Sequence, residues 1–157
     1  MLQASWRLQG DSLVLGDYKG TITNLNLVGN RYTVMTRGCT GATALCYSED
    51  SVMVGHNSSR VSVFSLGGGM AKVLKIHKNT IRNFSLNHLR KTAVSCSSDQ
   101  VAIWNTENWT RIRSLFPQTK DLIGAQVAPN SQSIYVCYAN SSIVQLNMGN
   151  FEVEATY

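Results

Sequence analysis

The chain has 157 residues, of which 43% are hydrophobic and 15% are charged, and its formal net charge at neutral pH is +5. This composition is typical of a globular domain with a sizeable core and excludes a disordered chain. No apolar run approaches the roughly 20 residues of a membrane-spanning helix, and the opening MLQASWRLQGD lacks the pattern of a secretory signal. We therefore expect a cytoplasmic protein that binds no membrane.

Short stretches of alternating apolar residues, which predict β-strands, begin at once. In chain order they read LQASWRL, SLVLGD, ITNL and RYTVMT, and polar or glycine turns separate them. The same succession follows as ATALCYS, SVMVGH, VSVF and AKVLKI. Each group predicts one sheet of four strands.

Two further groups complete the chain. They read IRNFSLN, TAVSCSSD, VAIW and TRIRSLF, and then LIGAQVA, SIYVCYAN, IVQL and FEVEATY. The third strands begin at residues 22, 61, 101 and 143, at intervals of 39, 40 and 42 residues. A small residue recurs late in each second strand, and residues at one equivalent position align in the four first strands. These two columns are Gly16, Gly55, Cys96 and Cys137, and Trp6, Tyr47, Leu86 and Val127.

A repeat of about 40 residues with four strands is the signature of a WD40 propeller. The sequence therefore predicts an all-β fold of four four-stranded antiparallel blades, at about 2–38, 42–79, 81–117 and 121–157. One such sheet cannot bury its faces alone, so neighbouring blades must stack. Propellers have 4–8 blades, and WD40 repeats usually close with about seven. Because the blade boundaries coincide with the ends of the sequence, we expect a segment of a larger propeller, completed by a longer chain or by a second copy.

The third group carries the clearest resemblance to the WD40 family. IHKNTIRNFSLN resembles the family's Gly-His opening and first strand, and AVSCSSDQVAIWN resembles its second and third strands. In that family a His, a Ser or Thr, an Asp and a Trp form a hydrogen-bonded set within a blade. The resemblance implies that this set is His77, Ser95, Asp99 and Trp104, with the histidine fixed between a carboxylate and a hydroxyl. The turn is one residue shorter than usual.

The other three groups depart from this pattern. Leu25, Phe64 and Leu146 fill the tryptophan position, and Lys19, Ser58 and Asn140 fall where the aspartate would be. The apolar columns persist while the polar sets are lost, so we expect the same fold with weaker blades.

A second resemblance covers about residues 2–148. LVLGDYKGTITNLNLVGNRYTVMTRGCTGATALCYS and SSDQVAIWNTENWTRIRSL resemble the N-terminal propeller region of the WD40-containing TBC-domain proteins of centriolar satellites. The resemblance implies a scaffold at the centrosome, at centriolar satellites or at the cilium base. TBC domains act on Rab GTPases, but this chain contains no TBC motif and is not assigned that activity.

The sequence does not favour an enzyme. His77 could act as a general base with Asp99, but a structural role within the blade is the favoured interpretation. The glycine run at 67–69 lacks the Lys-Ser or Lys-Thr of a phosphate loop, and the acidic residues are sparse. The cysteines form no Cys-x-x-Cys pair. We expect reduced thiols and neither a catalytic site, a metal site nor a cofactor.

The remaining hypothesis is a platform for other proteins, which propellers bind through loops at their rims. The candidate rim residues are Lys19, Asn57, Asn79, Gln100, Lys120 and Asn140. A cluster of basic residues leaves nucleic acid open as a partner. It comprises Lys72, Lys75, Lys78, Arg82, Arg90 and Lys91. The alternative function is therefore a basic WD40 subunit of an RNA–protein assembly such as a ribosome-biogenesis particle, although lysines also protect solvated sheet edges.

Overall fold

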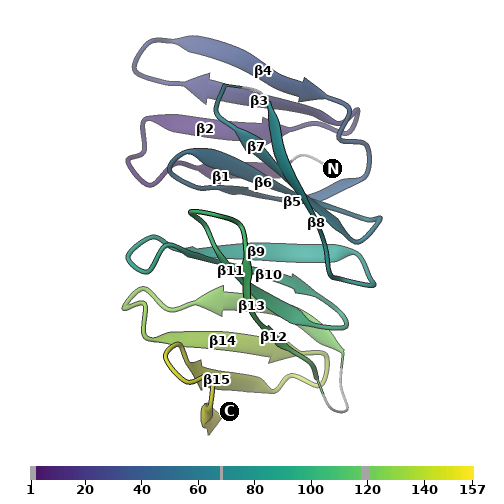
Figure 1. Cartoon of the computed structure of the whole chain (residues 1–157), viewed down its shortest axis with the longest axis vertical. Coiled ribbons are helices and arrows are strands. Elements are labelled where there is room, and N and C mark those ends of the chain that lie inside the picture. Colours follow the sequence, from purple (N-terminus) through teal and green to yellow (C-terminus); the bar gives the residue numbers. More distant parts are fainter. Residues whose placement is uncertain (1–2, 68, 118–120) are drawn as a thin grey trace. The chain divides into compact units, whose positions relative to one another are not determined.

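A computed structural model describes residues 3–67, 69–117 and 121–157. Across these ranges the chain forms sixteen β-strands and no helix (Figure 1). The strands make four separate sheets of four strands, and within each sheet every strand pairs antiparallel with the next one along the chain. The predicted all-β class and the four four-stranded antiparallel sheets are therefore confirmed.

Each sheet is a simple meander and is called a blade below. The first blade has the order β1-β2-β3-β4 and the second has the order β5-β6-β7-β8. Their strands are β1 (Gln3–Trp6), β2 (Ser12–Gly16), β3 (Thr21–Asn26), β4 (Arg31–Arg37), β5 (Ala42–Tyr47), β6 (Ser51–His56), β7 (Arg60–Ser65) and β8 (Met70–Lys75).

The third and fourth blades repeat this arrangement. Their orders are β9-β10-β11-β12 and β13-β14-β15-β16. Their strands are β9 (Ile81–Asn87), β10 (Thr92–Ser97), β11 (Val101–Asn105), β12 (Arg111–Leu115), β13 (Leu122–Val127), β14 (Ser133–Tyr138), β15 (Ile143–Asn147) and β16 (Val153–Thr156).

The strand registers confirm the sequence columns. The small residue of each second strand pairs with the first residue of the predicted third-strand tetrapeptide. These pairs are Gly16–Ile22, Gly55–Val61, Cys96–Val101 and Cys137–Ile143. A Cβ atom added at Gly16 would lie 2.9 Å from Cδ1 of Leu45 and 3.2 Å from Cδ1 of Ile22. A side chain at this point would therefore force Leu45 of the second blade to shift, because it approaches so closely.

The chain divides into two compact units, Met1–Ile76 and His77–Tyr157, and each contains two blades. In the first unit, Val14 and Ile22 of the first blade form one apolar cluster with Tyr47, Val54 and Phe64 of the second. All five side chains are at most 4% exposed. Burying residues of this size stabilises the fold by roughly 1.5–3 kcal/mol each, so the two blades are held together mainly by this cluster.

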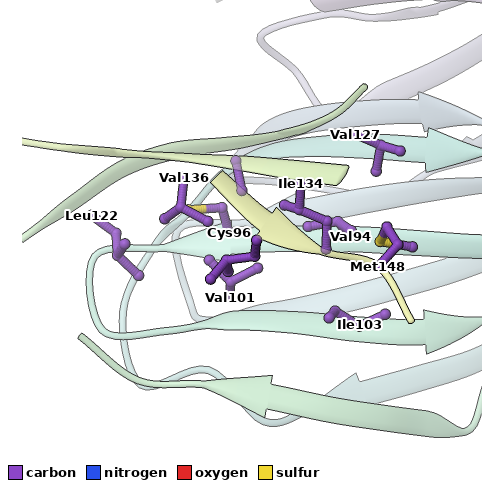
Figure 2. Packing of buried hydrophobic residues seen from close by; sticks show 11 residues of the cluster. Val94, Cys96, Val101, Ile103, Leu122, Val127, Ile134, Val136 and Met148 are labelled. Carbon is purple, nitrogen blue, oxygen red and sulfur yellow. The ribbon is translucent and has the colours of Figure 1, made fainter. Parts of the chain in front are cut away.

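The second unit has a matching core. Val94 and Val101 of the third blade form a cluster with Val127, Ile134 and Val136 of the fourth blade. Figure 2 shows these side chains between the two sheets. They occupy the alternate, inward positions of their strands, as period-two patterning requires.

A hydroxyl at one repeated position also joins the first strands of adjacent blades. Oγ of Ser5 in β1 accepts a hydrogen bond of 2.9 Å from the backbone N–H of Tyr47 in β5. Oγ of Ser85 in β9 accepts an equal bond of 2.9 Å from the N–H of Val127 in β13. Both pairs are 42 residues apart, so each unit stacks its two blades in the same register.

Candidate functional site

The third blade holds a buried chain of polar side chains at one end of its sheet. His77 lies just before β9, and its Nδ1 is 2.7 Å from Oγ of Ser97 and its Nε2 is 2.7 Å from Oγ of Ser95. Nε1 of Trp104 donates to the same Ser95 oxygen at 2.8 Å. Oγ of Ser97 donates to Oδ1 of Asp99 at 2.6 Å. The structure thus joins all four implied residues, with Ser97 as a fifth member.

The proton positions in this chain follow from the two ends. The indole of Trp104 can only donate, and the carboxylate of Asp99 can only accept. Because Ser97 donates to Asp99, it accepts from the Nδ1–H of His77. Nε2 of His77 then carries no proton and accepts from the hydroxyl of Ser95, which in turn accepts from Trp104. Every donor points from the indole towards the carboxylate, so all five groups are satisfied only when His77 is neutral.

The electrostatics agree with this assignment. Burial lowers the pKa of His77 to about 4, although the negative charge of Asp99 opposes this effect. For Asp99, burial raises the pKa, but hydrogen bonds from the Ser97 side chain and the Lys78 backbone lower it further, so its pKa lies below the usual value. Both ring nitrogens of His77 are occupied by hydroxyl groups, and this geometry favours a structural role over proton transfer.

One detail of the predicted set needs correction. The imidazole of His77 lies between two hydroxyls, whereas the sequence predicted a hydroxyl and a carboxylate. The reason is the short turn after β10, in which the N–H of Ser97 donates to the carbonyl of Gln100 at 3.0 Å. Asp99 therefore does not bond the imidazole directly. Its carboxylate accepts from Oγ of Ser97 and from the backbone N–H of Lys78, the latter at 3.2 Å. Ser97 could have been found from the sequence, because Ser95 and Ser97 alternate and share one strand face.

The other blades use different polar anchors at the turn between their second and third strands. In the first blade, Oδ1 of Asp17 accepts from the backbone N–H groups of Lys19 and Thr21 at 2.9 and 2.8 Å. In the second blade, Nε2 of buried His56 lies 3.0 Å from Oγ of Ser62. Sequence reasoning missed Asp17 and His56. Both directly follow the small residue of the second strand, which is also the position of Ser97.

The predicted rim residues have different surroundings. Lys19, Asn57, Asn79 and Asn140 are exposed in turns, and Oδ1 of Asn140 accepts from Oγ of Ser142 at 2.7 Å. Gln100 is only 1% exposed, so the expectation of a partner contact there is wrong. In the short turn, the backbone N–H of Ser97 donates to the carbonyl of Gln100, and this bond places Gln100 within the blade. Lys120 lies outside the described residues.

Each unit has a groove between its two blades, built from equivalent positions. The first groove, of about 440 Å³, is lined by Thr36, Gly38, His56, Arg60 and Phe64, among others. The second, of about 710 Å³, has their register equivalents, which are Leu115, Pro117, Tyr138, Ser142 and Leu146. At these positions the first unit therefore has an arginine and a threonine where the second has a serine and a leucine. The second groove has its own cation, Arg113, and it also has four hydroxyl-bearing residues: Ser114, Tyr138, Ser142 and Thr156.

Other kinds of site are not indicated by the described residues. Among them, no three His, Cys, Asp or Glu side chains lie close enough together to hold a metal ion. The same part of the chain contains no helix with the length and apolar character needed to cross a membrane. The four cysteines are free thiols, and burial raises the pKa of Cys46 and of Cys96 to about 12, so these two stay protonated.

Comparison with known proteins matches the sequence resemblance. No protein family profile matches the chain. It is 25% identical over 149 residues to TBC1 domain family member 31 of Xenopus laevis and 26% identical over 141 residues to that of Homo sapiens. The chain is a distant homologue of part of these proteins. The alignments cover 90% and 85% of this chain but only 14% and 13% of the relatives. The protein of Mus musculus is similar, with 25% identity over 141 residues.

Proposed function

We propose that this chain is a non-catalytic WD40 scaffold domain that binds other proteins. The observation that carries the proposal is that the buried histidines form structural hydrogen bonds. Both ring nitrogens of His77 are hydrogen-bonded within its own blade, and those of His56 contact Ser62 of its own blade and the carbonyl of Thr40. The accessible features are turns and inter-blade grooves. The homology to part of TBC1 domain family member 31 supports a repeat domain that can belong to a longer protein.

An exposed face of the first blade indicates where a further blade could stack. Trp6, Leu13, Leu25 and Tyr32 are cross-strand partners in the first blade and form an apolar row. Trp6 is 58% and Tyr32 is 74% exposed. In the second blade, the equivalent row is buried against the first blade. It includes Tyr47, Val52 and Phe64, at 2%, 0% and 4% exposed.

We propose that a further blade of a longer chain covers the exposed row. A second copy stacked head to tail is a poorer fit, because the fourth blade is polar on the face such a copy would present. There Glu154 accepts from Gln145 and Asn147 at 2.8 Å and from Ser133 at 3.2 Å. Burying this network against an apolar row would leave its charge without water or a cation.

Light scattering on the 157-residue chain at several concentrations tests this face. We expect the mass to rise with concentration without a plateau at a dimer, because the apolar row is uncovered but a second copy does not fit it well. The double variant Trp6→Gln with Tyr32→Gln should remove that rise, while Tyr18→Gln, another exposed aromatic residue, should not. A compact monomer at every concentration would contradict the proposal and favour a closed four-bladed ring.

Affinity capture of the tagged chain from cells, with and without ribonuclease, tests the scaffold function. We expect reproducible protein partners that survive ribonuclease treatment. Partners that disappear with the RNA would instead support a subunit of an RNA–protein assembly. The resemblance to centriolar-satellite proteins also leads us to propose a location at the centrosome or cilium base. Fluorescence microscopy with a centrosomal marker tests it, and a diffuse signal without enrichment would contradict it.

A further inference from the structure

We propose that the groove of the first unit binds an anionic side chain, either a carboxylate or a phosphate, on a peptide segment of a partner protein. Arg60 is the main cation of this site and Lys75 assists it. The inference rests on the proposed scaffold function, because the occupant is a segment of another protein.

The first observation is the chemistry of the groove wall. Thr36, Thr40, Ser58 and Ser62 contribute hydroxyl groups, and Arg60 contributes a guanidinium group. No Asp or Glu is among the described residues that line the groove. Its volume of about 440 Å³ lies within the roughly 300–1,000 Å³ of typical ligand sites. A wall with one cation, several hydroxyl donors and no acid suits an oxyanion.

The second observation is an unbalanced pair of cations. Arg60 in β7 and Lys75 in β8 are direct cross-strand partners, so their side chains leave the same face of the sheet. Like charges opposite each other destabilise a sheet. Within the described ranges, neither forms an ion pair with an acidic residue, and the ion pairs found there are Arg7–Asp11 and Lys91–Glu107. An anion bound between them would remove this repulsion.

The third observation is the second groove, which shows what the fold requires there. At the positions of Arg60 and His56, the second unit has Ser142 and Tyr138. At the position of Thr36 it has Leu115. The same groove therefore forms without a cation at that register position and without the hydroxyl of Thr36. The second groove has a cation of its own, Arg113, but that side chain lies over the ring of Phe151, 5.4 Å from its centre. The fold therefore does not require Arg60 or the hydroxyl of Thr36 at these two positions, which leaves both available to a ligand.

The apolar part of the wall defines the rest of the occupant. Phe64, Met70 and Val73 line the same groove as Arg60, and Met70 is 62% exposed. An apolar side chain beside the anionic one can cover these residues while the planar guanidinium of Arg60 binds two oxygens of the oxyanion. The favoured ligand is a peptide in which an Asp, a Glu or a phosphorylated residue has an apolar neighbour.

Nuclear magnetic resonance titration of the whole chain tests this site with three acetylated, amidated tripeptides: Leu-Asp-Leu, Leu-phosphoserine-Leu and Leu-Asn-Leu. We expect the two anionic peptides to shift the imidazole signals of His56 and to bind at least tenfold more tightly than the neutral peptide. Arg60→Gln should weaken both anionic peptides at least tenfold. Arg113→Gln, which removes a cation lining the second groove, is the matched control and should change neither affinity.

The outcomes separate the sources of the anion. Binding of both anionic peptides shows that a carboxylate is sufficient, and binding of the phosphopeptide alone identifies a phosphorylated residue; both results support the site. Equal binding of the neutral peptide, no binding, or full binding by Arg60→Gln overturns it. Binding of hexauridylate through Arg60, without peptide binding, would also overturn it and favour RNA. If a captured partner binds wild type and Arg60→Gln equally, the groove assignment is wrong while the scaffold function stands.

Discussion

Acidification should destabilise the fold through His77 at a pH where most carboxylates are still ionised. The folded state holds this imidazole neutral with a pKa of about 4, whereas an unfolded chain has the ordinary value of 6.5. Below pH 6.5 the unfolded chain therefore binds a proton that the folded chain does not, and stability falls until the pH reaches about 4. At pH 5 the loss relative to pH 7.5 is about 2 kcal/mol, since one unit of pKa corresponds to about 1.36 kcal/mol.

Urea denaturation at pH 7.5 and at pH 5 measures this loss. Burial also lowers the pKa of His56, so that residue adds to the loss in the same direction. The variant His77→Asn separates the two: it should be less stable than wild type at pH 7.5, but its further loss at pH 5 should be about 2 kcal/mol smaller. His56→Asn is the matched control and should keep the larger, His77-dependent part of the loss.

A direct titration makes the test independent of whether His77→Asn folds. The imidazole signals of His77 in the wild-type chain should show a midpoint near pH 4. A midpoint near 6.5, together with equal stability at pH 7.5 and pH 5, would refute the buried neutral histidine and the direction of the hydrogen bonds derived from it.

Three further predictions concern the same blade. Trp104→Ala should cost about 3–5 kcal/mol in denaturant unfolding, because Trp104 is 4% exposed, and an unchanged midpoint would show that the indole does not support the blade. His77→Ala, Asp99→Ala and the double variant should lose similar amounts of stability, because a broken hydrogen-bond chain is lost as a unit; strictly additive losses would argue against coupling. Ser95→Ala should cost about 1–3 kcal/mol, since it leaves a buried donor and a buried acceptor unpaired, and a smaller loss than at the exposed Ser58 would contradict the assignment.

The repeat and the strand columns were predictable because they depend on local patterning. Strand alternation has a period of two, and a one-residue error in register would turn every core side chain to the wrong face. The sequence columns that begin with Ile22 and with Gly16 were found from this patterning, and the structure shows that their members are cross-strand partners. The resemblance to the WD40 family added the polar set of His77, Ser95, Asp99 and Trp104.

The remaining features depend on contacts that local patterning does not encode. Gln100 is polar and follows a turn aspartate, so it was expected at the surface, but a tight turn buries it. Trp6 belongs to the same column as Tyr47, yet one is exposed and the other is buried. The difference arises because only the second blade has a described neighbour on that face. The cation pair of Arg60 and Lys75 needed the strand register, since the two are 15 residues apart in the sequence.

The central claim is that the two blades of each unit stack in the same register, and amide hydrogen exchange tests it most directly. The N–H groups of Tyr47 and Val127 belong to first strands, which pair with only one strand of their own sheet. They should be protected because a serine hydroxyl of the preceding blade accepts them. We predict that Ser5→Ala accelerates exchange at Tyr47 alone and that Ser85→Ala accelerates it at Val127 alone. Fast exchange at both amides in the wild-type chain, or no response to either variant, would contradict the stacking of blades described here.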